Sequence, residues 1–234
     1  MASAMNWSNV HAHDDDRLLR LDLADVREHL GSSGRVSSTV FRTMATQHLF
    51  KPRPWVQRIV SCYLHECGVV AENFITTFIR MSPEKEAEDK AHGVQVATLA
   101  EHVNLTLAEY HEWALPPVVY LQTSNPHALS NFKSAMSSAG MRVCYTDNLR
   151  SEHDTWGGRI NSDEQKMSDA VTGVVNLAIG SQATAFVSSS SSSWTWLTSS
   201  LMNRTIQPQS ARSCKKMSDS SLVIVSRGGA CQQY

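Results

Sequence analysis

The sequence has no long apolar run and no excess of charge of one sign, and these absences exclude several kinds of protein. No stretch approaches the roughly 18 consecutive apolar residues that a membrane span requires, so we expect no membrane segment. The 21 basic and 22 acidic residues give a formal net charge of −1, which argues against a nucleic-acid binder. Any anion site must therefore be local. The N-terminus also lacks the basic, apolar and small-residue order of a signal peptide.

Cysteine and other metal-ligating residues form no familiar pattern. The five cysteines are an odd number without zinc-ligand spacing, so we predict buried free thiols instead of a disulfide framework or a structural metal site. They are Cys62, Cys67, Cys144, Cys214 and Cys231. Two histidines and three aspartates in residues 11–16 are interpreted as an acidic terminus, because nothing fixes them as ligands in one geometry. No metal-binding residue is predicted.

The chain divides into three regions by composition. Residues 1–44 are polar and favour helix, and we interpret them as an N-terminal extension. Residues 45–208 form the main domain. Residues 209–234 are a tail with one short apolar strand at 222–225, which we expect at the edge of a sheet.

Strand and helix patterns alternate through the main domain. The apolar spacing predicts helices at 55–67, 99–113, 126–139 and 168–180, and strands at 74–80, 117–122, 142–145 and 183–187. Strands that alternate with helices of about 10 or more residues indicate a parallel, doubly wound sheet of the α/β class.

The strand at 74–80 ends in Arg80 and is followed by the charged residues Glu84, Lys85 and Glu86. Open parallel sheets bind ligands beyond the carboxyl ends of their strands, so Arg80 is a candidate contact for an anion. The alternative is a surface arginine that pairs with Glu84 or Glu86.

Two polar segments follow other strands. Six serines at 188–193 lie between an apolar strand and a predicted helix, where hydroxyls and backbone N–H groups favour phosphate. A serine-rich linker is the alternative. Residues 122–126 form a polar turn that contains Thr123 and Asn125, and an N-cap by Asn125 alone accounts for this turn.

Four collinear segments between residues 49 and 203 resemble the α-1,6-fucosyltransferases and related GDP-fucose-dependent enzymes. They are FKPRPWV (50–56), FITTFIRMSPEKEAE (74–88), PPVVYLQTSNPHALSNFK (116–133) and TGVVNLAIGSQATAFV (172–187) with the serine run. The resemblance implies the C-terminal, Rossmann-like half of a GT-B glycosyltransferase. Residues 1–44 are too few to build the other half. The chain is therefore interpreted as part of a longer enzyme or as a compact homologue.

The resemblance also implies roles for single residues. Arg80 stands where the family's motif arginine meets the diphosphate of GDP-fucose, and Ser191 and Ser192 match its phosphate-side serine pair. Lys85 matches the motif lysine, and Glu86 or Glu88 matches the acidic residue associated with activating the acceptor hydroxyl.

Other positions of the resembled motifs concern the nucleotide and differ from the family. Asn176 stands where an aspartate recognises the base, and Thr123 completes the predicted donor-binding residues. Phe78 replaces a histidine, Met81 a second arginine and Thr184 an aspartate.

Together these features predict an inverting fucosyltransferase that uses GDP-fucose and acts on a glycan or glycoprotein acceptor. An arginine and serine hydroxyls can balance the charge of the leaving diphosphate, so we predict metal independence and no cofactor. The positions that differ from the resembled family leave two alternatives: a catalytically silent domain that binds a nucleotide sugar, or a transferase that uses another nucleotide sugar. The resemblance implies the Golgi, and three N-glycosylation sequons, at Asn6, Asn104 and Asn203, are compatible with it.

Overall fold

The computed structural model describes residues 46–47, 49–91, 93–148, 150–151, 163–189, 192–202, 214–216 and 222–226. All of them belong to one compact unit, Thr43–Tyr234. The predicted N-terminal extension (1–44) and the histidine and aspartate cluster at 11–16 lie outside the described residues.

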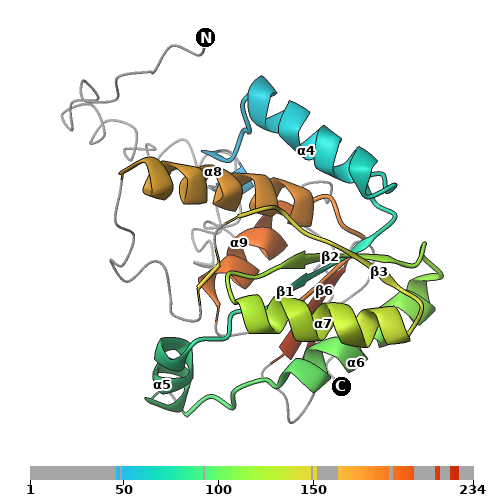
Figure 1. Cartoon of the computed structure of the whole chain (residues 1–234), viewed down its shortest axis with the longest axis vertical. Helices are drawn as coiled ribbons and strands as arrows, with labels where there is room; N and C mark the ends of the chain where they lie inside the picture. The colour runs from blue at the N-terminus through green and yellow to red at the C-terminus, as the bar shows by residue number, and fades with distance from the viewer. Residues whose placement is uncertain are drawn as a thin grey trace, which may run out of the picture. The chain divides into compact units, whose positions relative to one another are not determined.

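The described part of the chain builds one six-stranded sheet with the strand order β3-β2-β1-β4-β6-β5 (Figure 1). The strands are β1 (Ile75–Phe78), β2 (Val118–Gln122), β3 (Arg142–Cys144), β4 (Ala185–Ser189), β5 (Cys214–Lys216) and β6 (Leu222–Ser226). Strands β3, β2, β1 and β4 are mutually parallel, which confirms the predicted α/β class. Strands β6 and β5 extend the sheet in antiparallel pairs.

Helices cover both faces of the parallel strands (Figure 1). Helices α4 (Pro54–Glu66) and α8 (Asp163–Gly180) pack on one face, and α6 (Leu99–Trp113) and α7 (Pro126–Ser138) pack on the other. Helix α9 (Ser193–Met202) contacts α8, β4 and β6. Helices on both faces explain why β1, β2 and β4 are buried along almost their whole length.

Strand periodicity decides which side chains of β2 meet which helices. Val119 and Leu121 join the core under α6 and α7, whereas Val118 and Tyr120 join the core under α4 and α8. Because side chains alternate along a strand, Gln122 also lies on the α8 side. By the same rule Phe78 and Arg80 point to one side of β1, and Thr77 points to the other, where it shares a 2.8 Å hydrogen bond with Thr106 of α6.

Local capping signals fix the helix ends. Thr98 and Glu101 form a reciprocal capping box at the start of α6. The Asn125 side chain accepts a hydrogen bond from the Ala128 N–H and caps α7, as the sequence predicts. After α7, Gly140 adopts a left-handed φ of 75°, a conformation that glycine takes without strain.

Two elements differ from the prediction. The tail strand β6 is not at the edge, because it pairs with β4 on one side and with β5 on the other. The charged segment after Arg80 forms helix α5 (Pro83–Ala91), where the sequence analysis expects none. The proline at its first position and the Ser82 hydroxyl, which accepts from the Lys85 N–H, start this helix.

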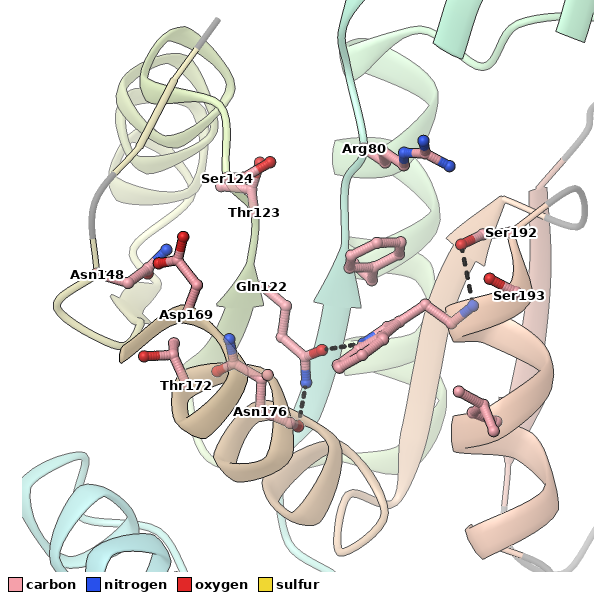
Figure 2. A pocket seen from close by; sticks show the side chains of 14 residues that line it. Arg80, Gln122, Thr123, Ser124, Asn148, Asp169, Thr172, Asn176, Ser192 and Ser193 are labelled. Atoms are coloured by element: carbon pink, nitrogen blue, oxygen red, sulfur yellow. Dashed lines mark hydrogen bonds between the residues drawn. The ribbon is translucent and has the colours of Figure 1, made fainter. Parts of the chain in front are cut away.

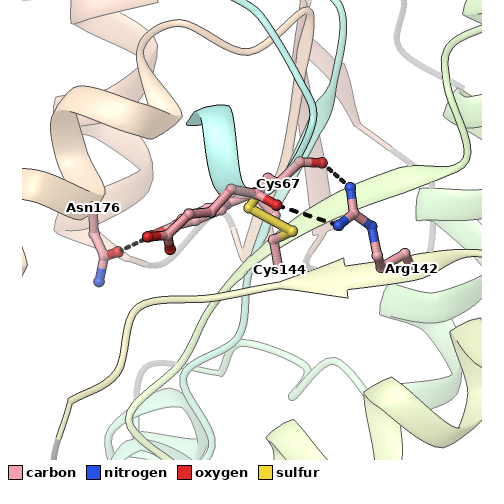
Figure 3. Close-up of a disulfide and its surroundings, with 6 residues drawn as sticks. Cys67, Arg142, Cys144 and Asn176 are labelled. Carbon is pink, nitrogen blue, oxygen red and sulfur yellow. Dashed lines mark hydrogen bonds between the residues drawn. A yellow bond between two sulfur atoms is a disulfide. The ribbon is translucent and has the colours of Figure 1, made fainter. Parts of the chain in front are cut away.

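The prediction of free, buried thiols is wrong for three cysteines. Cys67, which follows α4, forms a disulfide with Cys144 at the end of β3 (Figure 3). Cys62 is a free but exposed thiol. The 77 residues between the two bonded cysteines leave no local signal, and only the fold brings their Cα atoms to 5.9 Å. The Cys214 side chain and Cys231 lie outside the described residues.

The guanidinium of Arg142 reinforces the same junction. It donates to the backbone carbonyls of Glu66 and Cys67, at the carboxyl end of α4 (Figure 3). These carbonyls have no partner within the helix, so the arginine satisfies acceptors that the helix end leaves open. The disulfide and Arg142 therefore join α4 to β3 at the same place.

Candidate functional site

A pocket of about 440 Å³ lies at the carboxyl ends of β1 and β2, between α8 and α9 (Figure 2). Its lining includes charged, polar and aromatic side chains from five parts of the chain. They are Phe78, Arg80, Gln122, Thr123, Ser124, Asn148, Asp169, Thr172, Gly173, Asn176, Ser192, Ser193, Trp194 and Leu197. The position is the one at which open parallel sheets bind ligands.

Arg80 and the start of α9 form one side of this pocket (Figure 2). The Arg80 side chain is 30% exposed, and its Nη1 lies 3.7 Å from Oε2 of Glu88. The alternative interpretation expected such an ion pair with Glu84 or Glu86, and the structure shows one with Glu88. The Glu88 carboxylate is 46% exposed, so this ion pair is accessible from solvent.

The described part of the serine run is built into the end of β4 and the start of α9, not into a linker. Ser192 is buried, and its hydroxyl accepts from the Trp194 N–H at 3.2 Å. Ser188 and Thr195 share a hydrogen bond of 2.5 Å, which ties the strand to the helix. Ser191 lies outside the described residues. The amino end of α9 thus opens onto the pocket, where the helix dipole favours an anion.

Helix α8 forms the opposite side of the pocket. Asp169, Thr172, Gly173 and Asn176 are spaced by three, four and seven residues, so they share one helix face. The other face of α8 packs on α4 through Val175, Ala178 and Ile179 in the core. An amphipathic helix with its polar face toward a cavity is the arrangement that this spacing predicts.

Asn176 is held by its neighbours. Its Oδ1 accepts from the Tyr120 hydroxyl at 2.8 Å and from the Thr146 hydroxyl at 3.1 Å. Burial raises the pKa of Tyr120, so the phenol stays protonated and donates at any physiological pH. The Thr146 hydroxyl also lies 3.2 Å from Asn148 Oδ1, and its single proton is shared between the two amide oxygens.

Gln122 crosses the base of the pocket and connects both helices (Figure 2). Its Nε2 donates to the Asn176 carbonyl at 2.7 Å, and its Oε1 accepts from the Trp194 indole at 2.8 Å. Trp194 also contacts Phe78, with a ring-centroid distance of 6.0 Å. A Cβ at Gly180 would lie 2.8 Å from Gln122 Nε2, so the glycine makes room for the amide.

Asp169 carries the carboxylate among the lining residues of the pocket. The side chain is half-buried as a whole, but its Oδ2 is shielded from solvent and has no hydrogen-bond partner among the described residues. Desolvation raises the pKa of Asp169 above its ordinary value. Asp169, Gln122 and Trp194 are not among the site residues predicted from the sequence. The helical spacing from Asp169 to Asn176 is the signal that would have found the first of them.

The structure brings only part of the predicted site together. Arg80, Thr123, Asn176 and Ser192 line one pocket, whereas Lys85, Glu86 and Glu88 lie on α5 and are not among its lining residues. Their predicted catalytic roles, like those of the lining residues, stay predictions.

The three residues on α5 have different surroundings. The Lys85 side chain is 4% exposed and its ammonium lies 2.7 Å from Asp89 and 3.5 Å from Glu88. Glu86 is exposed and lies 3.9 Å from Lys90. Of the three, Glu88 is therefore the one in direct contact with a pocket residue, Arg80.

Neither a metal cluster nor a membrane helix is found where the structure describes the chain. No three histidine, cysteine, aspartate or glutamate side chains are grouped in a way that would hold a metal ion in that part. Among the described helices, none has the length and apolar character needed to cross a bilayer.

The fold and pocket define an α/β domain with a pocket at the carboxyl edge of a parallel sheet. No family model and no curated protein matches the sequence. The fold is similar to the crystal structure of POFUT1 in complex with GDP-fucose, with a TM-score of 0.50 and 10% identity, over 73% of this chain and 48% of that chain. A crystal structure of POFUT1 in complex with GDP gives a TM-score of 0.47 at 9% identity, over 75% and 51% of the two chains.

This likeness shows that the described part of the chain has a fold similar to that of POFUT1. The chain spans about half the length of the POFUT1 chain that it matches. Membership of the α-1,6-fucosyltransferases stays a prediction.

Proposed function

We propose that this domain binds GDP-fucose in the pocket and transfers fucose to a glycan or glycoprotein acceptor, with inversion and without a metal ion. One observation carries the proposal: Arg80 and the amino end of α9, with Ser192 and Ser193, converge on a single pocket at the carboxyl edge of the sheet. The similarity of the fold to POFUT1, whose crystal structure contains GDP-fucose, supports this choice of ligand.

The diphosphate would lie between the arginine and the helix. A guanidinium binds phosphate oxygens through two parallel hydrogen bonds, and a helix amino end adds N–H donors and a partial positive charge. Together they stabilise the negative charge that develops on the leaving nucleoside diphosphate. The charge on the leaving nucleoside diphosphate can therefore be stabilised without a divalent metal ion.

Glu88 is our choice for the general base. Its carboxylate is 46% exposed and lies beside Arg80, so an acceptor hydroxyl can reach it next to the diphosphate. In the reaction, Glu88 takes the hydroxyl proton while the acceptor oxygen bonds to C1 of fucose. The bond from C1 to the phosphate oxygen breaks, and its electron pair leaves with GDP. Attack opposite the leaving group inverts C1.

The compartment is proposed by resemblance to be the Golgi. The disulfide between Cys67 and Cys144 supports an oxidising compartment, because such bonds persist there and are rare in the cytosol.

The test is release of radiolabelled fucose from GDP-fucose in EDTA, with water as the acceptor when no glycan is supplied. We expect turnover by the wild type and at least a 100-fold loss for Glu88→Gln, since removal of a general base has about this effect. The matched control is Glu112→Gln, which changes an exposed carboxylate on α6, away from the pocket. Turnover that appears only after magnesium or manganese is restored would contradict the metal-independent mechanism.

Two alternatives give different results in the same preparation. A silent nucleotide-sugar-binding domain would melt at a higher temperature with GDP but release no fucose. A transferase with another donor would be stabilised by UDP or ADP and not by GDP. Asn176 stands where the resembled family has an aspartate that recognises the base, and its amide oxygen already accepts from Tyr120 and Thr146. This difference keeps the second alternative in the comparison.

A further inference from the structure

Gln122 joins the two helical walls of the pocket through one side-chain amide (Figure 2). It is the last residue of β2 and is only 2% exposed. Its Nε2 donates to the backbone carbonyl of Asn176 in α8 at 2.7 Å, and its Oε1 accepts from the indole N–H of Trp194 in α9 at 2.8 Å. We call these two hydrogen bonds the amide bridge.

The two partners of the amide bridge restrict which side chain can form it. A backbone carbonyl only accepts a hydrogen bond and an indole N–H only donates one, so the group between them must carry both a donor and an acceptor. An amide carries both at every physiological pH, whereas an ionised carboxylate carries acceptors alone. Gly180 leaves the space for this amide, since a Cβ there would lie 2.8 Å from Gln122 Nε2.

The amide bridge ends at the part of the pocket that is proposed to bind the diphosphate. Trp194 is the second residue of α9, and its backbone N–H donates to the Ser192 hydroxyl at 3.2 Å. Its ring also contacts Phe78, which lies two residues before Arg80. The indole is therefore fixed between the amino end of α9 and the segment that carries Arg80.

We propose that Gln122 is a positioning residue, which holds Trp194, and through it the amino end of α9, at the separation from Arg80 that a diphosphate requires. Gln122 itself contacts no phosphate. Side chains that are fixed by such supporting hydrogen bonds keep a binding site within about 0.5 Å of its productive geometry. The inference rests on the proposed function, because it takes the ligand between Arg80 and α9 to be a diphosphate.

The first test is calorimetric titration of GDP and guanosine with Gln122→Met, which keeps the length of the side chain and removes the N–H donor. GDP should bind about 10-fold more weakly, on the scale of one hydrogen bond. Guanosine affinity should change little, because the groups that lose their support face the phosphates. The matched control is Gln57→Met on α4, where an exposed glutamine donates to the Pro52 carbonyl; this variant should bind GDP as the wild type does.

Gln122→Glu provides a second test, because protonation of the introduced carboxyl restores the missing donor. The protonated carboxyl donates to the Asn176 carbonyl and still accepts from the indole, whereas the ionised form cannot donate. Burial raises the pKa of such a carboxyl, so the amide bridge is replaced in mildly acidic solution and lost as the pH rises through that pKa. The GDP affinity of Gln122→Glu relative to the wild type should therefore improve as the pH falls, while the ratio for Gln122→Met stays constant.

The titratable groups around this position are the same in all three proteins. They are Arg80 after β1, Tyr120 on β2 and Asp169 on α8, and α9 has no charged residue. Dividing each affinity by that of the wild type at the same pH removes their effect and that of the GDP phosphates. Circular dichroism checks that each variant is folded.

Three results would overturn the role of Gln122: unchanged GDP affinity in Gln122→Met, an equal loss of GDP and guanosine affinity, or a ratio for Gln122→Glu that does not depend on pH. In each of them the wild type still binds GDP, so the proposed function stands. If the wild type does not bind GDP, the proposed function fails and this inference fails with it.

Discussion

The disulfide between Cys67 and Cys144 gives the most quantitative prediction about stability. It joins the end of α4 to the end of β3 across 77 residues of chain. In the chain-entropy description, a cross-link stabilises the fold because it restricts the unfolded chain, and the effect grows with loop length. For a loop of this size the expected contribution is about 4.5 kcal/mol.

Reduction should therefore lower the free energy of unfolding by about this amount and the melting temperature by on the order of 10 °C. The assay is urea denaturation with and without dithiothreitol, for the wild type and for Cys144→Ser. Without dithiothreitol, Cys144→Ser should have the same free energy of unfolding as the reduced wild type. Dithiothreitol should not destabilise this variant further. Cys62→Ser, a change at an exposed free thiol, should behave as the wild type does.

The reasoning is refuted if dithiothreitol leaves the wild-type denaturation curve unchanged. A peptide map under non-reducing conditions provides the second check, because the peptides that contain Cys67 and Cys144 should elute as one cross-linked species. Recovery of both peptides as separate alkylated thiols from the native protein would contradict the disulfide itself.

Three further predictions concern the pocket and its supports. Gly180→Ala should cost about 1–2 kcal/mol in unfolding free energy by urea denaturation, because its Cβ displaces the Gln122 amide from its hydrogen bonds; a variant as stable as the wild type would contradict this. Thr98→Ala should lower stability by about 1 kcal/mol and Thr98→Ser by much less, since serine keeps the cap of α6. Asp169→Asn should stabilise the fold slightly at pH 7, because burial raises the pKa of Asp169 and the charged form is unfavourable. This gain should vanish below the ordinary carboxyl pKa of 3.8, where aspartate is protonated in both states, and a gain that persists at low pH would contradict it.

The elements with strong local signals were predictable from the sequence. Helix α6 has the predicted bounds, because its apolar spacing coincides with the capping residues Thr98 and Glu101. The parallel strands follow from short apolar runs that alternate with helices, and the side of the sheet on which Arg80 lies follows from the period of two along β1.

The features that depend on distant residues were not predictable. Helix α5 has no apolar face, and its buried Lys85 is stabilised by an ion pair with Asp89. The place of β6 between β4 and β5 is decided by non-local pairing. The same holds for the disulfide, whose cysteines meet only after α4 and β3 are in place.

The candidate site divides in the same way. Arg80, Thr123 and Ser192 follow strands, and the rule that ligands bind at the carboxyl edge of a parallel sheet is enough to bring them together. Predicting Asp169 and Gln122 requires knowing which polar groups already have hydrogen-bond partners in the folded chain. That knowledge comes from the hydrogen bonds of Tyr120, Thr146 and Trp194, which join segments far apart in the chain.

The central claim is that Arg80 binds the diphosphate of a nucleotide in this pocket, and calorimetric titration of GDP and guanosine in EDTA tests it most directly. The wild type should bind GDP, and Arg80→Ala should weaken GDP about 100-fold while it changes guanosine affinity little, because the lost contact is to phosphate. Arg58→Ala, at an exposed arginine on α4, is the matched control and should bind GDP as the wild type does. Equal loss of GDP and guanosine affinity in Arg80→Ala, or unchanged GDP affinity, would contradict the account.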